Sequence, residues 1–210
     1  DREVASLVDG PQPGMDEVFS YSTGGTNEFR DPREKWMPSD TGKWSLGGML
    51  THLDALVAIG ASTVNSYRRL NDTGMWAPVG RSWGLQNRSC AIRASSPDRF
   101  EFRCVDSMVN PYLMQSALLK ACSDGLNNKI DPGPPEERNF VDVVNSGEDV
   151  SRIPTTLRDA LDALAESDVI KSALPGDMYG IYDWYKRDEW NKFIWETSDW
   201  DVKTYLDCLP

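Results

Sequence analysis

Histidine is almost absent from this sequence, with His52 as the single histidine among 210 residues. Catalytic triads that depend on histidine, and metal sites with several histidine ligands, cannot be built from this chain alone. His52 lies in the stretch GGMLTHLDALVAIG, where Met49 and Leu53 belong to a set of apolar residues at helical spacing. A lone histidine on an apolar helix is more often structural than catalytic, so we expect a structural role for His52.

Long apolar runs, paired cysteines and leader motifs are also missing. No stretch approaches the ~18 consecutive apolar residues of a membrane span, and no signal-peptide pattern opens the sequence. The four cysteines form no C-x-x-C pair, which leaves zinc and thioredoxin-like chemistry without support. Cys90 and Cys104 could face each other across a hairpin, which permits a disulfide without requiring one. We expect a soluble protein of the cytoplasm or an organelle interior, in a reducing compartment and without a transmembrane segment.

Positive charge is in deficit, because 22 lysines and arginines face 33 aspartates and glutamates, for a net charge of −11. An acidic protein repels polyanions, so we expect no nucleic-acid partner and no anionic membrane surface. The common phosphate-binding patterns G-x-x-x-x-G-K-[ST] and G-x-G-x-x-G are absent as well. A nucleotide site in this protein would therefore have to be built from arginine side chains on a sheet.

Arginines are present in one place above all, the stretch GMWAPVGRSWGLQNRSCAIRASSPDRFEFR at residues 74–103. Five of them occur there, namely Arg81, Arg88, Arg93, Arg99 and Arg103. The residue pattern predicts two strands within QNRSCAIRA and RFEFRCV, joined by a turn at residues 95–98. This acidic chain therefore concentrates five guanidinium groups in and around a predicted hairpin.

The second predicted strand separates its side chains onto two faces. In RFEFR the alternation is strict, so Arg99, Glu101 and Arg103 share one face, which we call the charged wall. The two phenylalanines share the other face and belong to the core. A five-residue loop would place Arg93 opposite Arg99 on the charged wall, whereas a slip of one residue would place it behind.

The charged wall has two interpretations. It is either a solvated strand face with cross-strand ion pairs, each worth less than ~1 kcal/mol, or a site for a polyanion. Guanidinium groups bind phosphate and carboxylate through two parallel hydrogen bonds. A carboxylate among them can hold a divalent cation that bridges the same phosphates. The spacing alone leaves both interpretations open.

Apolar spacing and capping residues predict the remaining elements. We expect an α+β fold with further strands over 17–23 and 79–84. A helix is expected over 45–59, ending at Gly60 in a left-handed conformation. Further helices are expected from Asn110 to about Gly125, from Thr156 to about 166, and in a tail over 177–207. The tail is rich in aromatic residues, and we expect these to pack against the rest of the molecule.

Five segments follow one another in the order and wording of a known family. They are TVNSYRRL (63–70), GMWAP (74–78), NRSCAIR (87–93), RFEFR (99–103) and NPYLMQSALLKACSDGLNNKIDPG (110–133). Over about residues 12–210 the chain resembles the C-terminal half of the glutamine synthetase catalytic domain. The resemblance implies a curved antiparallel sheet with flanking helices, a helical C-terminal tail and a site between subunits of a ring-shaped oligomer.

The resemblance also implies a reaction. Members of the family use ATP and Mg²⁺ or Mn²⁺ to form γ-glutamyl phosphate from glutamate, which an amine then attacks to give an amide. By the matching motifs, Arg88 and Arg103 would stabilise the phosphoryl group in transfer, and Arg69 would bind the glutamate carboxylate. Arg93 and Arg99 would bind the ATP phosphates, and Glu101 would be a metal ligand. Such an arrangement suits phosphoryl transfer, which relies on positioning and on charge stabilisation.

Two positions depart from the family pattern. Ammonia-using members carry a glutamate in the flap segment where this chain has Trp76, and an indole suits an apolar amine better than ammonium. The metal-binding strand Gly-Met-His-x-His-x-Ser is best matched by GMDEVFS at 14–20. This match places Asp16 at the first histidine, and aspartate can still ligate Mg²⁺. We therefore expect Trp76 in the substrate site and Asp16 beside Glu101 at the metal.

The resemblance begins in the middle of the catalytic domain. Residues 1–210 are expected to be a partial catalytic domain that lacks the family's N-terminal domain and the first half of the catalytic sheet. Half a sheet exposes an edge and a core face, so we expect a homo-oligomer or a larger assembly that completes it. The alternative to a ligase is a catalytically inactive module that serves as a structural or docking subunit.

Overall fold

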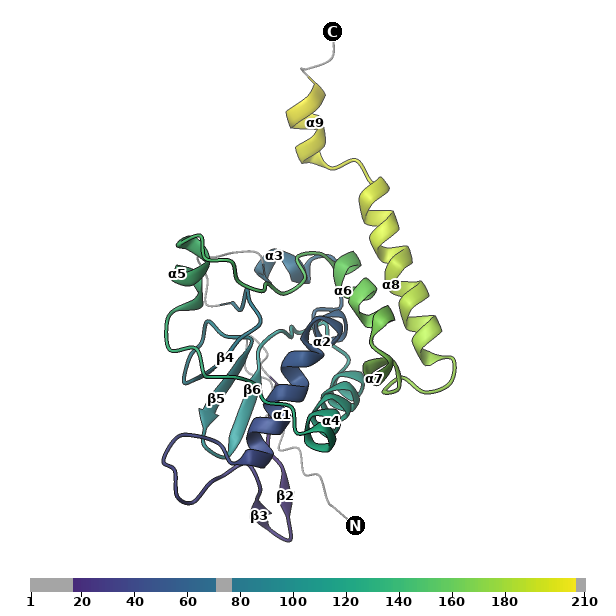
Figure 1. Ribbon diagram of the computed structural model, residues 1–210. Helices are drawn as coiled ribbons and strands as arrows, with labels where there is room; N and C mark the ends of the chain where they lie inside the picture. Colours follow the sequence, from purple (N-terminus) through teal and green to yellow (C-terminus); the bar gives the residue numbers. More distant parts are fainter. Residues whose placement is uncertain (1–16, 71–76, 207–210) are drawn as a thin grey trace.

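The computed structural model describes residues 17–70 and 77–206 and shows an α+β arrangement, as the sequence predicts (Figure 1). Its main sheet has the strand order β1-β6-β5-β4. The strands are β1 (Glu17–Phe19), β4 (Trp83–Leu85), β5 (Ile92–Ser96) and β6 (Arg99–Phe102). A separate hairpin of β2 (Ser22–Thr23) and β3 (Thr26–Asn27) follows β1.

The sheet is mixed, whereas a fully antiparallel sheet was expected. β6 pairs antiparallel with both β1 and β5, but β4 runs parallel to β5. Parallel neighbours usually need a long crossover. Here β4 has three residues and spans only about 10 Å, so the loop over 86–91 is long enough to return the chain. The expected strand over 79–84 is accordingly shorter, and Gly80 instead forms an isolated bridge with Arg152.

The strict alternation of β6 appears as expected. Phe100 and Phe102 are fully buried, whereas Arg99 is exposed and Glu101 half-buried. The two phenylalanines face the apolar core together with their cross-strand neighbours Ala94 and Ile92. One face of the sheet is therefore core, and the other carries charge.

The helix expected over 45–59 is two helices, α1 (Asp40–Thr51) and α2 (Leu53–Gly60), with a break at His52. The ring of His52 bridges Asp124 at 2.9 Å and the hydroxyl of Ser167 at 3.2 Å, which agrees with a structural role. Gly60 is not a left-handed exit, because its φ is not positive. A Cβ on Gly60 would lie 2.6 Å from the carbonyl oxygen of Cys104, so close packing explains this glycine.

α4 (Pro111–Asn128) begins as the sequence predicts. Asn110 caps it by accepting hydrogen bonds from the backbone N–H groups of Tyr112 and Leu113. The helix continues past Gly125, which is a packing position and not a helix end. Gly125 and Gly48 meet where α4 crosses α1, and a Cβ on Gly48 would lie 2.1 Å from a backbone oxygen of α4. These glycines let the two helices pack backbone to backbone under the sheet.

The shorter helices complete the globular part. They are α3 (Ser66–Leu70), α5 (Phe140–Asn145), α6 (Leu157–Glu166) and α7 (Asp168–Lys171). Thr156 caps α6 by accepting from the backbone N–H of Asp159, as expected. α6 packs against α2 and α8, so the apolar core extends from the sheet through α2 to α6.

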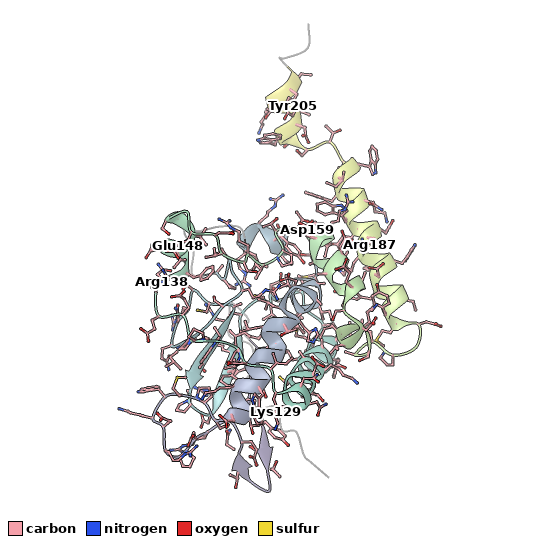
Figure 2. The ribbon with its side chains drawn as sticks, viewed as in Figure 1. Lys129, Arg138, Glu148, Asp159, Arg187 and Tyr205 are labelled. Carbon is pink, nitrogen blue, oxygen red and sulfur yellow. The ribbon has the colours of Figure 1, made fainter. Side chains whose placement is uncertain are left out.

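The expected helical tail is present as α8 (Met178–Trp195) and α9 (Asp199–Tyr205). α8 packs against α6, and α9 extends away from the rest of the molecule, with Tyr205 near the far end (Figure 1, Figure 2). Tyr182 and Trp190 pack against the core, but Trp184 is 68 % exposed and Trp195 is 86 % exposed. The expectation that the aromatic residues of the tail pack internally is therefore wrong for most of them. None of the helices in the described ranges is long and apolar enough to cross a membrane.

Candidate phosphate-binding site

The centre of the charged face is a carboxylate between two guanidinium groups. Arg93 on β5 lies directly opposite Glu101 on β6, and its Nη1 donates to Glu101 Oε2 at 3.0 Å. Arg103 Nε lies 3.8 Å from the same oxygen. All three side chains are largely buried, at 17 %, 13 % and 9 % exposure for Arg93, Glu101 and Arg103. Strand pairing continues to Ser96 and Arg99, so the five-residue loop that would set Arg93 opposite Arg99 is not formed.

Arg69 reaches this group from α3. Its Nη2 donates to the carbonyl oxygens of Arg103 at 3.3 Å and Val105 at 2.6 Å. Both hydrogen bonds use one nitrogen, so the guanidinium is fixed beside the end of β6 by one corner. We call Arg69, Arg93, Glu101 and Arg103 the arginine cluster. Four residues that are up to 34 positions apart in the sequence thus form one connected group.

Arg88 stands on a turn that its neighbours hold rigidly. Asn87 Oδ1 accepts from the backbone N–H of Ser89 at 3.0 Å, and Asn87 Nδ2 donates to the carbonyl oxygens of Glu136 and Arg138. Ser89 Oγ in turn accepts from the backbone N–H of Phe140 at 2.8 Å. With anchors on both sides, Arg88 itself is exposed. The turn at residues 87–89 therefore fixes the backbone of Arg88 and leaves its side chain exposed to solvent.

Arg138 is a second exposed arginine close to Arg88, but it forms ion pairs. Arg88 and Arg138 both line a depression of about 290 Å³ after β4. Arg138 pairs with Glu136 and Glu148, each at 3.0 Å (Figure 2). Among the described residues, Arg88 has no ion pair and no side-chain hydrogen bond. Arg99, exposed at the start of β6, shares this state. We call Arg88 and Arg99 the rim arginines.

Gln86 is a residue of this region that sequence reasoning missed. Its backbone φ is +54°, in the left-handed region that side chains with a Cβ rarely adopt. Its Oε1 accepts from Arg93 Nη2 at 2.5 Å, and its Nε2 donates to the carbonyl oxygen of Ser95. Glutamine has no preference for this conformation, so no local signal in the sequence points to it.

Asp16 and Trp76 lie outside the described residues. On β1, Val18 lies opposite Glu101 and shares its face, while Glu17 is half-buried on the core face. Burial raises the pKa of Glu17 above its ordinary value. No described carboxylate other than Glu101 therefore belongs to the cluster.

The donor set does not fit a divalent cation by itself. Within the described ranges, no group of three or more His, Cys, Asp or Glu side chains is placed to hold a metal ion. Glu101 supplies one carboxylate, and Arg93 and Arg103 already engage it. What the described residues can do is hold an anion with several negative oxygens.

The described cysteines take no part in this site. Cys90, Cys104 and Cys122 are not in disulfides, so the bridge that the sequence permits between Cys90 and Cys104 is not formed. Burial raises the pKa of Cys90 to about 11 and that of Cys122 to about 12. Both thiols are therefore protonated at neutral pH and unreactive.

The structure is an α+β domain with a group of arginine side chains on the charged face of its sheet. Residues 13–205 match the family described as glutamine synthetase, catalytic domain. The chain belongs to this family. Its expected family and fold class are thereby confirmed.

Relatives and solved structures agree with this assignment. The chain is 37 % identical over 188 residues to a glutamine synthetase of Archaeoglobus fulgidus, covering 85 % of this chain and 38 % of that protein. For the glutamine synthetase of Pyrococcus woesei the identity is 38 % over 191 residues, covering 88 % and 42 %. The solved structure "GmaS/ADP complex-Conformation 1" superimposes with a TM-score of 0.83 at 32 % identity, covering 91 % of this chain and 45 % of that one. The chain thus spans less than half the length of these proteins.

Proposed function

We propose that this chain is the C-terminal part of a ligase that joins glutamate to an organic amine with ATP. The observation that carries the proposal is the arginine cluster, in which the guanidinium groups of Arg93 and Arg103 flank the Glu101 carboxylate and that of Arg69 binds the backbone just after β6. The two rim arginines, which have no partner among the described residues, lie at the start of β6 and on the turn after β4. This combination supports a site where a polyphosphate is held and a phosphoryl group is moved, because such reactions depend on fixed positive charge.

In the proposed reaction a γ-carboxylate oxygen of glutamate attacks the γ-phosphorus of ATP. The new O–P bond forms as the bond to ADP breaks, and the amine then attacks the acyl carbon and releases phosphate. Arg69 would hold the glutamate carboxylate with the part of its guanidinium that does not bind β6. Arg93 and Arg99 would lie along the ATP phosphates. Arg88 and Arg103 would stabilise the phosphoryl group in transfer.

The family uses ATP and a divalent metal, and a similar solved structure is described as an ADP complex. We propose that Glu101 supplies one ligand to a Mg²⁺ or Mn²⁺ ion, that Asp16 supplies another, and that further ligands come from polypeptide outside the described residues. We also propose that Trp76 contacts an apolar amine, because an indole cannot accept a proton from ammonium at neutral pH. No step above depends on where the metal lies.

A complete site needs more polypeptide than residues 1–210, which we propose are a partial catalytic domain. Two features support a homo-oligomer or a larger assembly as the source. β1 is an edge strand of the sheet, so its outer backbone groups are available for pairing. Exposed apolar side chains are also concentrated on α8 and α9, including Trp184 and Trp195.

The ligase proposal is tested by ADP release from the full-length protein with glutamate, Mg·ATP and a panel of amines that includes ammonia. We expect turnover that requires both glutamate and an alkyl or aryl amine, with ammonia as the poorest acceptor. A folded protein that releases no ADP with any amine would rule the proposal out. Turnover with ammonia alone would remove the role proposed for Trp76 and leave the ligase assignment in place.

A second function is favoured by one specific observation. Glu101 is the single described carboxylate in the cluster, and Val18 stands opposite it where the family motif has its second histidine. If the chain is a catalytically inactive module that docks into a larger assembly, it needs no metal, which would explain why the described residues offer so few metal ligands. Calorimetric titration with ATP separates the two functions, because an inactive module has no reason to bind ATP with the micromolar to millimolar affinity of an enzyme site.

A further inference from the structure

Gln86 adopts a backbone conformation that its position does not explain. Gln86 and Lys129 are the two non-glycine residues with positive φ in the described ranges, at +54° and +51°. Lys129 ends α4, and helices commonly finish in this conformation. Gln86 directly follows a strand instead, so no helix end accounts for it. Backbone strain of this kind persists where surrounding interactions hold it, and it is concentrated at functional sites.

The interactions that hold Gln86 all lead to β5. Its backbone N–H donates to the carbonyl oxygen of Ala94 at 3.0 Å. Its side-chain oxygen accepts from Arg93 Nη2, and its side-chain nitrogen donates to the carbonyl oxygen of Ser95. Rotating the amide by 180° would place N–H against N–H and oxygen against oxygen, so the neighbours determine one orientation. Both the oxygen and the nitrogen of the amide are therefore engaged, which fixes its orientation.

Arg93 is consequently held at both of its terminal nitrogens. Glu101 accepts from Nη1, and Gln86 accepts from Nη2. A guanidinium is planar, so two separate anchors fix its plane as well as its position. Nη1 donates to both oxygens of Glu101, whereas Nη2 donates to Gln86 and keeps a second N–H, whose direction the fixed plane determines. An arginine fixed in advance loses less side-chain entropy when it binds an anion.

We propose that Gln86 is a positioning residue that fixes the guanidinium plane of Arg93 for a phosphate group of ATP. The inference rests on the proposed function, because Gln86 acts through Arg93 and touches no reacting atom. The left-handed backbone is what brings the amide to Arg93 immediately after β4 ends. The strain and the two side-chain hydrogen bonds thus have one common result, which is a rigid arginine.

Two substitutions separate the side chain from the backbone strain. Gln86→Gly removes the amide and relieves the strain at once, whereas Gln86→Asn keeps a shorter amide on a residue that tolerates positive φ. The matched control is Lys129→Gly, which relieves the same strain at the end of α4. Lys129 lies at that end of α4 in Figure 2, and its cation contacts the ring of Trp44 rather than the cluster.

The first readout needs no ligand. Nitrogen-15 spectra of the 210-residue chain report how fast each arginine guanidinium rotates. We expect slow rotation for Arg93 in the wild type and in Lys129→Gly, and faster rotation in Gln86→Gly. Unchanged Arg93 signals in a folded Gln86→Gly variant would overturn the positioning role, whatever the chain binds.

The second readout is calorimetric binding of inorganic tripolyphosphate to the full-length protein and its variants. We expect about tenfold weaker binding for Gln86→Gly, the typical loss of a charged hydrogen bond, no change for Lys129→Gly, and partial recovery for Gln86→Asn. Equal binding by the wild type and Gln86→Gly would overturn this inference and leave the proposed function intact. No binding by the wild type, even when Gln86→Gly loosens Arg93, would contradict the proposed phosphate site itself and the inference that rests on it.

Discussion

The arginine cluster and the rim arginines use the same side chain in opposite ways. In the cluster, each guanidinium has a carboxylate or carbonyl partner and little exposure, as for Arg93 at 17 %. At the rim, Arg88 and Arg99 are exposed and have no partner among the described residues. The contacts of the cluster are thus formed within the described residues, whereas the rim arginines keep their charge available for a partner that is not among them. Stability and function are therefore expected to respond separately to substitution.

The largest expected effect concerns Arg88 and catalysis. Arg88→Ala should lower ligase turnover of the full-length protein about 1,000-fold, the lower range for an arginine that stabilises phosphoryl transfer. Its stability should change by less than about 0.5 kcal/mol, because the side chain has no partner to lose. The control is Arg138→Ala in the same depression, which should leave turnover within about threefold. Equal losses in the two variants would remove the distinction between a paired and an unpaired arginine.

The second prediction concerns the cluster and stability. Glu101→Gln removes the one carboxylate between Arg93 and Arg103 and leaves two largely buried cations side by side. We expect a loss of about 3 kcal/mol in the free energy of unfolding, measured with urea. Tripolyphosphate should restore part of this loss, since it supplies the missing negative charge. A change below about 0.5 kcal/mol would show that the cluster is no more than a solvated strand face.

The third prediction concerns Arg81, an arginine from the same stretch with a purely structural position. It donates to the carbonyl oxygen of Leu50 at 2.7 Å and pairs with Asp54 at 2.7 Å. Burial raises the pKa of Asp54, and Arg81 opposes that shift. In Arg81→Ala the opposition is lost, so the pKa of Asp54 rises further in the folded state. We expect a loss of about 1–2 kcal/mol at pH 7.

The sign of the pH dependence in Arg81→Ala follows from this shift. A carboxyl group whose folded-state pKa is raised opposes folding only when it is ionised. The penalty is therefore present at pH 7 and disappears as the pH falls through the folded-state pKa toward the ordinary value of about 3.9. Urea titrations of both proteins between pH 7 and pH 4 check this. A stability difference that grows on acidification would contradict the account.

The smallest expected effect belongs to Arg99. Arg99→Ala should weaken tripolyphosphate binding about threefold to tenfold and reduce the salt dependence of binding, because one cation is lost from an exposed position. Stability should stay within about 0.5 kcal/mol of the wild type. Binding that is unchanged at low salt would place Arg99 outside the site and leave Arg88 as the only rim arginine in it.

Much of the fold followed from local rules. The alternation of RFEFR predicted the buried Phe100 and the charged Glu101, and Asn110 and Thr156 predicted two helix starts, because these features depend on neighbouring residues alone. The break at His52 was missed, since its cause is a contact with residues on α4 and beside α7. Contacts between distant segments leave no mark on periodicity.

The sequence predicted which residues make up the candidate site better than it predicted how they are arranged. Motif resemblance named the arginines of the cluster, but the opposition of Arg93 to Glu101 depends on a register irregularity at the hairpin. The part played by Gln86 depends on a strained backbone that glutamine does not signal. The roles assigned to all these residues remain predictions that the experiments above address.

The most direct test of the central claim is amide hydrogen exchange of the full-length protein with and without ATP. The claim is that the arginine cluster and the rim arginines form one phosphate site on the sheet. We predict that ATP slows exchange at residues 86–89 and 99–103, and leaves it unchanged along α8 and α9. Slowing confined to other segments, or no slowing at millimolar ATP, would contradict the account.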